Sequence, residues 1–457
     1  MKRILVSETL KNIGNEVLLK GWVRTRRDHG KLIFLDLRDR SGVVQLIINP
    51  QVSPKAHQIA REIRPEYAVS VTGKVNKRPD SMINPELETG TVEVEVQKLE
   101  ILSRAEELPF DLGGPALNLN LETLLDHRSL SLRHPKIAAI FKVQETIVQS
   151  FREILKNFDF TEIQVPTIVA STTEGGAEVF RIKYYDHDAY LAQSPQLYKQ
   201  ILVSAFERVF TLAHVYRAEP SITTRHISEY LSLDVELSFI DSWEELMDLA
   251  ENVVASMIQN IRKNNQQELN LFGVQVPEIK NAIPRIKMRE AQEIIFKRTG
   301  RDHQGEPDLD PSDEKELCGW AKENSGAPFV FITHYPTKKR PFYTYPNPSD
   351  SEYTLSFDLL GINEEWITGG QRINNYQELL ENIKKRGNEP EDFTTYLEAF
   401  RYGMPPEGGF AIGLERVTKD ILGLKNIREA SLFPRDMERV DQRFSQMKTQ
   451  KQEKKLP

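Results

Sequence analysis

Apolar and polar residues alternate along residues 17–104, and this period of two predicts a succession of short strands. Alternating or β-branched stretches stand between Gly, Asp, Asn and Pro residues: VLLKGWVRTRR, KLIFLDLRD, GVVQLII, YAVSVTGKV and TVEVEVQKLEIL. A helical stretch, PKAHQIAREI, precedes the fourth of them. Together they predict a small closed β-barrel of the oligonucleotide-binding type over residues 1–104.

From about residue 134 the apolar residues take the spacing of a helix. PKIAAIFKVQETIVQSFREILKNF predicts a long helix that opens with a proline, and FTEIQVPTIVAS predicts a strand that Pro166 restricts to an edge or an interface. Further helices are predicted near residues 193–207, 243–264, 287–298, 313–323 and 376–386, and strands near 208–217, 230–240, 328–333, 353–359 and 408–412. This mixed order, with hairpin-like neighbours, predicts an α+β domain around an antiparallel sheet over residues 134–440.

Two segments have the composition of connecting or terminal chain. RAEELPFDLGGPALNLN, rich in Pro, Gly and Asn, predicts a linker over residues 105–133. The charged, low-complexity end SQMKTQKQEKKLP predicts a disordered tail over residues 441–457.

The composition is that of a soluble globular protein, with 39% hydrophobic and 28% charged residues in 457, a length that favours two domains. The net charge of −7 excludes a generally basic nucleic-acid binder, so RNA or DNA must be held by local patches. The single cysteine, Cys318, excludes an intrachain disulfide framework and fits a reducing cytoplasm. The first residues offer too short an apolar run for a signal peptide, and no later stretch is long enough to span a bilayer. We therefore expect a cytoplasmic protein without membrane attachment.

The stretch VYRAEPSITTRHISEYLSLDVEL, residues 215–237, combines many charges with the alternation of a buried strand. In a strand, Asp234 and Glu236 point to the same face, opposite to the leucines and the valine between and around them. Carboxylates on such a face, preceded by arginines, are costly unless a ligand or ions complete the site. The alternative is a hairpin with ion pairs on the surface.

Three other stretches carry candidate chemistry. In FAIGLERVTKDILGL, Arg416 falls in the first turn of a helix beginning near Leu414, where a cation opposes the helix dipole unless a polyphosphate binds there. In FDLLGINEEWITGGQRI, Asp358 and Glu365 are hard oxygen ligands suited to Mg²⁺, although acids at this spacing are usually solvated. In this stretch the glycines at 369 and 370 allow a close backbone approach before an arginine.

The third stretch, SPQLYKQ, predicts a helix start with Ser194 as N-cap and Pro195 at the first position. Lys199 then lies one turn into the helix, where it could equally be a solvated lysine. The preceding TEGGAE is a flexible, turn-forming segment.

These stretches together resemble the class II aminoacyl-tRNA synthetases. RAE…TRHISEY…LDVE is similar to their motif two, GFAIGLERV to motif three and the strand with Pro166 to motif one. TEGGAE, QSPQLYKQ and GGQR resemble the aspartyl-tRNA synthetases, with a catalytic domain similar to the archaeal and eukaryotic type. GWVRTRRDHGKLIFLDLRDRSGVVQLII and NPELETGTVEV resemble the anticodon-binding barrel of the bacterial form. The resemblance covers about residues 5–437, without the large bacterial insertion between motifs two and three.

The resemblance implies roles for the charged residues. Arg217 would bind the ATP α-phosphate, Glu219 the adenine side, and Tyr230 would stack on adenine. The β- and γ-phosphates would be faced by Arg225, His226 and Arg416, with Arg217 and Arg416 as the catalytic pair. Mg²⁺ would be held by Asp358, Glu365 and the Thr368 hydroxyl, Glu365 also belonging to the ATP site.

The resemblance also implies the amino acid. Lys199 and Arg372 match the pair that holds the aspartate side-chain carboxylate, and the surroundings of its α-ammonium are matched by Glu174, Ser194, Gln196 and Asp234. Two cations desolvated together require an anion, whereas a neutral amide leaves charge uncompensated. Asparaginyl relatives usually lack the lysine and carry GGS in place of GGQ, so aspartate is favoured.

In the barrel, the resemblance implies that Phe34 stacks on an anticodon base, that Gln45 contacts a base edge, and that Arg24, Arg26 and Arg27 contact phosphates. By pattern alone, Phe34 could instead belong to the core. Two departures are a PSI sequence at 220–222, where relatives carry polar residues that contact the acceptor end, and EWI at 365–367, which replaces smaller residues at the pocket floor.

The implied activity is an ATP-dependent ligase that joins L-aspartate to tRNA(Asp) through an aspartyl-adenylate, with tRNA(Asn) left open as a second substrate and a homodimer expected. Lys199 argues against an asparagine-specific ligase, and the barrel argues against an asparagine-synthetase-like paralogue. A non-catalytic RNA-binding paralogue would have lost the motif arginines, but Arg217, Arg372 and Arg416 are present.

Overall fold

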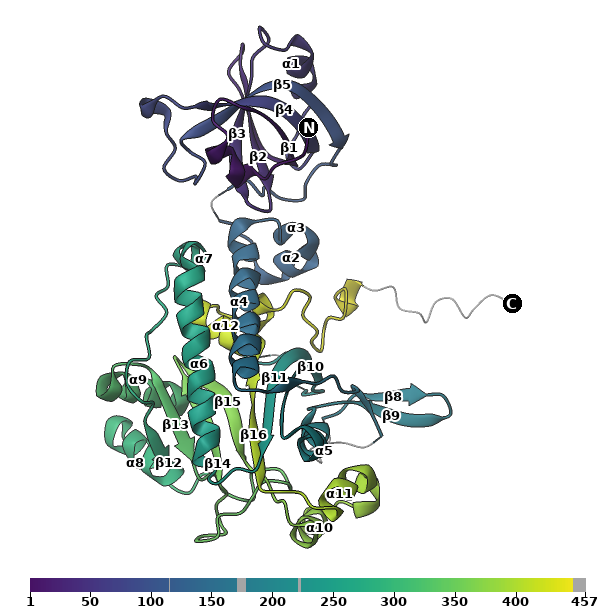
Figure 1. Cartoon of the computed structure of the whole chain (residues 1–457), viewed down its shortest axis with the longest axis vertical. Coiled ribbons are helices and arrows are strands. Elements are labelled where there is room, and N and C mark those ends of the chain that lie inside the picture. The colour runs from purple at the N-terminus through teal and green to yellow at the C-terminus, as the bar shows by residue number, and fades with distance from the viewer. Residues whose placement is uncertain (115, 171–177, 221–222, 447–457) are drawn as a thin grey trace. The chain divides into compact units, whose positions relative to one another are not determined.

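The computed structural model (Figure 1) describes residues 1–114, 116–170, 178–220 and 223–446 of the chain. It divides into a unit of residues Met1–Leu119 and a unit of residues Asn120–Pro457. Within the described ranges, no helix has both the length and the apolar character needed to cross a bilayer.

The first unit is a closed barrel of five strands, as its alternating sequence predicts. The strands β1 (Glu16–Asp28), β2 (Ile33–Asp39), β3 (Gly42–Ile48), β4 (Ala68–Lys77) and β5 (Val92–Ser103) close in the order β1-β2-β3-β5-β4. The helix α1 (Pro54–Ala60) begins where Ser53 accepts a hydrogen bond from the backbone of Ala56. Every second side chain of β2, from Ile33 to Leu37, is fully buried inside the barrel.

The second unit is built on an eight-stranded sheet in the order β12-β13-β14-β15-β16-β11-β10-β6. Neighbouring strands are antiparallel except at the two edges, where β12 pairs with β13 and β6 pairs with β10 in parallel. The strands are β12 (Arg285–Lys287), β13 (Phe329–Thr333), β14 (Ser356–Gly361), β15 (Glu364–Gln371), β16 (Glu407–Gly413), β11 (Glu229–Ser238), β10 (Arg208–Tyr216) and β6 (Thr161–Glu162). The prediction of an α+β domain with a largely antiparallel sheet is confirmed.

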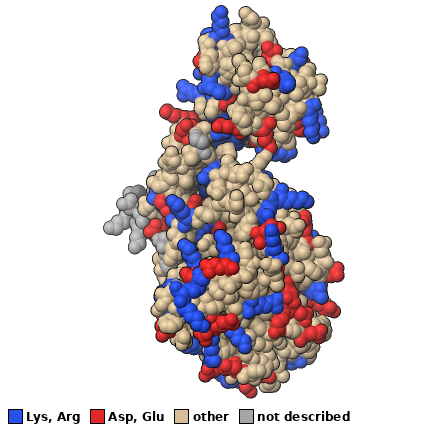
Figure 2. Space-filling view, turned by 90° about the vertical axis from the view of Figure 1, so that its left-hand side faces the viewer, with Lys and Arg blue, Asp and Glu red and all other residues tan. Residues whose placement is uncertain are grey.

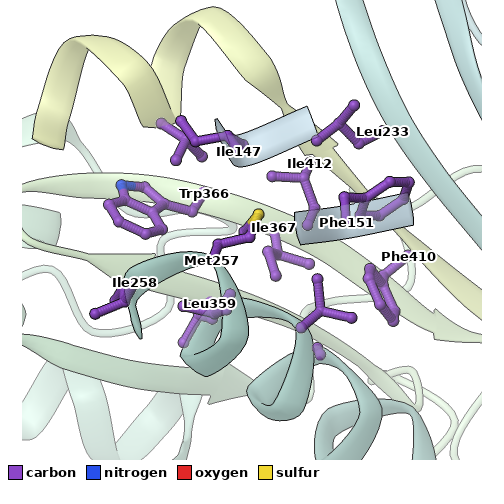
Figure 3. Close-up of a cluster of buried hydrophobic side chains, with 14 of the residues drawn as sticks. Ile147, Phe151, Leu233, Met257, Ile258, Leu359, Trp366, Ile367, Phe410 and Ile412 are labelled. Carbon is purple, nitrogen blue, oxygen red and sulfur yellow. The ribbon is translucent and has the colours of Figure 1, made fainter. Parts of the chain in front are cut away.

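One face of this sheet is covered by two long helices, α4 (Pro135–Asn157) and α6 (Glu244–Asn264), which lie side by side (Figure 1). The shorter α12 (Leu414–Leu422) contributes to the same apolar layer. Its buried side chains, drawn in Figure 3, include Ile147, Phe151, Leu233, Met257, Ile258, Leu359, Trp366, Ile367, Phe410 and Ile412. Because alternate strand residues enter this layer, the residues between them face the other side of the sheet.

Other helices surround this second face. The helix α5 (Gln196–Phe206) packs against β10 and β11, and α8 (Met288–Thr299) and α9 (Pro311–Ser325) pack at the β13 side. The helices α10 (Tyr376–Lys385) and α11 (Thr394–Arg401) share a third apolar cluster with α5. The small helices α2 (Leu121–Asp126), α3 (Arg128–Ser131) and α7 (Gln266–Phe272) and a three-stranded sheet of β7 (Ile168–Val169), β9 (His187–Leu191) and β8 (Arg181–Tyr184) complete the unit.

Two local predictions differ from the structure. The stretch expected as one strand around Pro166 forms two short strands, because β6 pairs with β10 whereas β7 pairs with β9 of the other sheet. The helix α5 begins at Gln196 with Pro195 at the cap position, although Ser194 Oγ still accepts a hydrogen bond from the Gln196 backbone at 3.2 Å.

The segments expected as linker and tail hold further structure. The helices α2 and α3 lie within residues 105–133 and belong to the second unit. Of the expected tail, residues 447–457 lie outside the described residues, as do Glu174 and residues 221–222 of the PSI sequence.

Candidate active site

A cavity of about 440 Å³ opens on the polar side of the eight-stranded sheet. It gathers side chains from all four candidate stretches, which lie far apart in the sequence. Its lining includes the predicted residues Ser194, Gln196, Arg217, Glu219, Arg225, His226, Tyr230, Asp358, Glu365, Thr368, Arg372 and Arg416. Two further predicted residues, Lys199 and Asp234, are fully buried and do not line the cavity.

Lys199 and its neighbours form one end of this site. Its ammonium lies 2.7 Å from Asp234 Oδ1 and 3.1 Å from Glu236 Oε2. Arg372 contacts the same Glu236 carboxylate, with its Nε 2.8 Å from Glu236 Oε1. Arg372 also lines the cavity. We call Lys199, Asp234, Glu236 and Arg372 the four-charge cluster. Asp234, Glu236 and Lys199 are all 0% exposed. The alternative predictions of a hairpin with ion pairs on the surface and of a solvated Lys199 are therefore wrong.

The four-charge cluster is electrostatically self-consistent. Burial alone would raise the pKa of Glu236, but the Arg372 guanidinium and the Lys199 ammonium offset it and hold that pKa below its ordinary value. Glu236 is therefore an ionised carboxylate deep in the protein. The cost of burying its charge is offset because both cations contact it. Gln196 adds a hydrogen bond from Nε2 to Glu236 Oε1 at 3.1 Å.

A glycine makes room for this arrangement. Gly409 of β16 stands opposite Glu236 of β11 in the sheet register. A Cβ at Gly409 would collide with the Val235 carbonyl and with the Glu236 carboxylate, and the Gly409 carbonyl accepts a hydrogen bond from Arg372 at 3.1 Å. The glycines predicted to allow a close approach do so as well, since a Cβ at Gly369 would lie 2.7 Å from the Gly409 carbonyl.

The other end of the cavity is rich in arginine. Arg416 stands in the first turn of α12, which begins at Leu414 as predicted, and its Nη1 lies 3.2 Å from Glu365 Oε1. The Arg217 guanidinium lies 5.7 Å from the centre of the Tyr230 ring and 3.8 Å from Glu219. These cations face a shared space, and they are the groups that a polyphosphate would require.

The last two residues of the predicted phosphate site have acidic partners. Arg225 Nε lies 2.8 Å from Glu364 Oε2, and a second carboxylate, that of Glu314 on α9, pairs with the same guanidinium. His226 Nε2 lies 3.4 Å from Glu219. The arginines of this end are therefore held in place by protein carboxylates.

The predicted magnesium ligands lie on neighbouring strands. Asp358 of β14 stands opposite Thr368 of β15 in the register, and Asp358 is only 4% exposed. Burial and then the charge of Asp358 raise the pKa of Glu365 to about 7. Two carboxyl groups that repel each other fit a divalent cation. Since Asp358 is buried, the prediction that it is a solvated acid is wrong, whereas the Glu365 side chain is 32% exposed.

Arg340 is a site residue that the sequence did not reveal. Its Nη2 lies 2.8 Å from Asp358 Oδ1, its Nη1 donates to Thr368 Oγ1 at 2.9 Å, and its guanidinium lies 3.9 Å from the centre of the Tyr335 ring. It belongs to THYPTKKRPFYTY, a stretch with neither helical nor strand periodicity, so no pattern placed it beside the cavity. Glu314 was also missed, because it lies in a predicted helix, near residues 313–323, that none of the candidate stretches includes.

The EWI departure does not insert a large side chain into open space. Trp366 is 1% exposed and packs in the hydrophobic core, with its ring centre 5.3 Å from that of Phe329. Its Nε1 donates a hydrogen bond to Asp420 Oδ2 at 2.8 Å.

On the barrel, Arg27, Phe34 and Gln45 share the outer surface of β1, β2 and β3. Arg26 stands opposite the buried Leu35 and donates to the Ala60 carbonyl at 3.1 Å, and Arg24 donates to the Gly113 carbonyl at 3.3 Å. Phe34 alternates with the buried residues of β2 and lies outside the barrel core, so the core reading of Phe34 is wrong. Arg27 donates to Gln45 Oε1 at 3.2 Å, and the His29 ring, which the sequence did not single out, lies edge-on to Phe34 at 5.5 Å. On the face of the molecule in Figure 2, basic and acidic side chains are interspersed, which agrees with a local rather than a general basic surface.

Comparison with known proteins adds independent information. Residues 120–437 match the family described as tRNA synthetases class II (D, K and N), and residues 17–102 match the OB-fold nucleic acid binding domain. The chain is 42% identical to the aspartate–tRNA(Asp/Asn) ligase of Deinococcus radiodurans, over 96% of this chain and 99% of the relative. It is 40% identical to the aspartate–tRNA(Asp) ligase of Pyrococcus furiosus, over 93% of this chain and 96% of the relative.

Solved structures agree on the fold. The asparaginyl-tRNA synthetase of Pyrococcus horikoshii, complexed with asparaginyl-adenylate, superimposes with a TM-score of 0.88 at 33% identity, over 96% of this chain and 99% of that one. A putative aspartyl-tRNA synthetase from Leishmania major superimposes with a TM-score of 0.86 at 30% identity, over 96% of this chain and 95% of that one.

Proposed function

The chain belongs to the class II tRNA synthetases (D, K and N), and on this premise we propose that it is an aspartate–tRNA ligase, which activates L-aspartate with ATP and transfers it to tRNA. The observation that carries the choice of aspartate is the pairing of Lys199 with Arg372 around Glu236, at the amino-acid end of the cavity. The likeness to an asparaginyl enzyme does not decide this choice, because that similarity is one of fold.

Selection of the amino acid follows from charge. The side-chain carboxylate of aspartate would accept hydrogen bonds from Arg372, with Lys199 behind it adding positive potential. An asparagine amide in the same place could turn its NH₂ group, which is a donor only, toward Arg372 and so would not accept the hydrogen bonds that the aspartate carboxylate accepts, and such a loss can cost a factor of about 10⁴ in specificity. Ser194 and Gln196, which line the cavity, are proposed to contact the α-ammonium, with the buried Asp234 adding negative potential.

The first chemical step requires no protein base. The aspartate α-carboxylate, already ionised, attacks the α-phosphorus of ATP in line, forms the aspartyl-adenylate and expels pyrophosphate. Arg217 would donate to the α-phosphate oxygens as negative charge builds on them, while Arg225, His226 and Arg416 hold the β- and γ-phosphates. Catalysis then comes from positioning and from charge stabilisation, which explains why the cavity is lined with arginines.

The oxygen ligands at the cavity fit Mg²⁺. Asp358, Glu365 and Thr368 would hold it, because two of them are carboxylates brought together by neighbouring strands and the repulsion between them is relieved by a cation. Bound there with ATP, the ion would neutralise part of the phosphate charge. Arg340 and Arg416 contact the same carboxylates and would have to share them with the ion.

Transfer to tRNA completes the reaction. The terminal ribose hydroxyl of tRNA attacks the aspartyl carbonyl of the adenylate and displaces AMP. On the barrel, Phe34 would stack on an anticodon base, Gln45 would contact a base edge, and Arg27 would contact phosphate. We propose tRNA(Asp) as the substrate, with tRNA(Asn) as a second one that relatives such as the Deinococcus radiodurans ligase accept by name. A cytoplasmic homodimer, formed through the motif-one segment around Pro166, belongs to the same proposal.

Two assays test the function. Exchange of labelled pyrophosphate into ATP should depend on aspartate and proceed far more weakly with asparagine. Charging of purified tRNA(Asp) and tRNA(Asn) with labelled aspartate should succeed for the first and tells whether the second is also a substrate. Exchange that is faster with asparagine than with aspartate would overturn the assignment.

A further inference from the structure

A second buried glutamate, Glu407, lies beside the four-charge cluster and has no part in the mechanism above. It is the first residue of β16 and is 0% exposed. Its Oε1 accepts a hydrogen bond from Gln200 Nε2 at 2.7 Å, and Gln200 Oε1 in turn accepts from the Tyr396 hydroxyl at 3.2 Å. Its backbone carbonyl accepts from the Arg372 amide at 2.9 Å. Glu407 is thus fixed directly against the residue that faces the ligand.

The other carboxyl oxygen of Glu407, Oε2, is buried near a second carboxylate, that of Glu236, which can only accept hydrogen bonds when ionised. The Glu407 and Glu236 side chains are within hydrogen-bonding contact of each other. Among the described residues, Glu407 Oε2 has no hydrogen-bond donor, whereas Glu236 Oε2 lies 3.1 Å from the Lys199 ammonium. Two ionised carboxylates offer acceptors only, whereas a single proton on the pair supplies a donor between them and satisfies the buried Glu407 oxygen.

The surroundings decide which glutamate holds that proton. Glu236 contacts the Lys199 ammonium at 3.1 Å and the Arg372 guanidinium at 2.8 Å, so it is the ionised partner. Among the described residues, the side chain that donates to Glu407 is the neutral amide of Gln200. Burial, followed by the charge of Glu236, raises the pKa of Glu407 well above its ordinary value, with Arg372 opposing it.

We propose that Glu407 is a protonated carboxylic acid at neutral pH that donates a hydrogen bond to Glu236 and so keeps the aspartate pocket free of surplus negative charge. The inference rests on the proposed function. Lys199 and Arg372 carry two positive charges, and Asp234 and Glu236 carry two negative ones, so the four-charge cluster is neutral before ligand enters. An ionised Glu407 would leave it with one extra negative charge against an anionic substrate.

The proton also positions Arg372. A donor on Glu407 takes up part of the accepting capacity of Glu236, so that the guanidinium of Arg372 is less strongly drawn back from the cavity. Glu407 is therefore a positioning residue that acts on the substrate through Glu236 and Arg372. The other titratable groups around it, Lys199, Asp234 and Tyr396, lie on α5, β11 and α11.

Infrared difference spectroscopy of the full-length protein tests the proton directly. We expect the wild-type minus Glu407→Gln spectrum at neutral pH to contain the carbonyl stretch of a protonated carboxylic acid. Asp420→Asn is the matched control, because Asp420 is a buried acid whose pKa is raised only to about 6, and its difference spectrum should show the loss of a carboxylate. A carboxylate loss in the Glu407→Gln spectrum would overturn the proposal. Should that variant fail to fold, Glu407→Met gives the same spectral comparison.

A pair of variants then tests the positioning role. Glutamine can still donate to Glu236 and accept from Gln200, whereas methionine has a similar length and cannot donate. In aspartate-dependent pyrophosphate exchange, we expect the Gln variant to keep the wild-type KM for aspartate. We expect the Met variant to raise this KM by about tenfold, the effect of losing about one hydrogen bond to a charged group. Equal KM values for the two variants, or a tenfold rise in the Gln variant, would overturn the role of the proton. Wild-type exchange with aspartate is measured first, so a failure of the proposed function is seen separately.

Discussion

The ammonium of Lys199 lies 2.7 Å from the carboxylate of Asp234, and these side chains are 0% and 1% exposed. A lysine with this degree of burial is stable only when its charge is matched, and the same ammonium also contacts Glu236. The pair therefore joins α5 to β11 and sets the electrostatic character of the pocket at the same time.

Replacing Lys199 should affect both stability and activity. Among the described residues, Lys199→Met leaves the buried Asp234 with no cation and the buried Glu236 with Arg372 alone. We expect a loss of about 3–5 kcal/mol in the free energy of unfolding. Urea unfolding followed by tryptophan fluorescence measures this loss. Aspartate-dependent exchange should also fall in the fraction that remains folded.

The control is a lysine whose ion pair is exposed. Lys297 lies 3.5 Å from Glu293 one turn away in α8, and the two side chains are 72% and 55% exposed. Lys297→Met should change the free energy of unfolding by less than about 0.5 kcal/mol. A similar loss in both variants would contradict the role given to the four-charge cluster.

Arg217 gives a prediction for catalysis that separates chemistry from folding. Its side chain is 41% exposed at the cavity, so Arg217→Ala should leave the unfolding midpoint nearly unchanged. Without a donor to the charge that develops on the α-phosphate, adenylate formation should fall by at least about 10²-fold. Unchanged aspartate-dependent pyrophosphate exchange in a folded variant would refute the role of Arg217.

Much of this fold follows from periodicity. In β11, the alternation of Leu233 and Val235 with Asp234 and Glu236 predicts both the apolar face under α4 and the charged face that bears the site, and the structure has both. The break at Pro166 could not be predicted in this way. It depends on β6 and β7 pairing with different sheets, and such long-range pairing leaves no period in the local sequence.

The site was predictable where charge patterns coincide with regular elements. Arg416 at the start of α12 and Asp358 within β14 could be placed because helix and strand geometry fixes their direction. Arg340 could not be placed, since it lies in irregular chain, and Glu407 could not be placed, since it is a single acid before two glycines. Their burial arises from segments that meet only in the folded protein.

The barrel allows a test of tRNA binding that leaves adenylate formation unaffected. Phe34→Ala removes a stacking surface outside the barrel core, and loss of one base–aromatic stack costs about 1–3 kcal/mol. We expect the KM for tRNA to rise about 5- to 150-fold, because each 1.4 kcal/mol is a factor of ten, while pyrophosphate exchange without tRNA is unchanged.

Trp22→Ala is the matched control for Phe34→Ala. Trp22 is an aromatic residue of β1 that is 41% exposed and lies against Arg38, at the opposite end of the β1–β2 pairing from Phe34. It should leave the KM for tRNA unchanged. An equal rise in both variants would indicate that the barrel as a whole, and not the Phe34 surface, had been disturbed.

Asp420 of α12 predicts a pH dependence of stability. It accepts hydrogen bonds from Trp366 Nε1 at 2.8 Å and from Asn363 Nδ2 at 2.9 Å, and burial raises its pKa to about 6. A carboxyl group whose pKa is raised by folding contributes stability that is complete below its unfolded pKa and is lost as the pH rises through the folded value. Wild type should therefore lose about 1–3 kcal/mol relative to Asp420→Asn between about pH 4 and pH 7.

Urea unfolding of wild type and Asp420→Asn across this pH range measures the difference. The control is Asp441→Asn, at a residue whose side chain is 84% exposed, and its stability should stay parallel to that of wild type. A constant difference between wild type and Asp420→Asn would show that Asp420 titrates at its ordinary pKa.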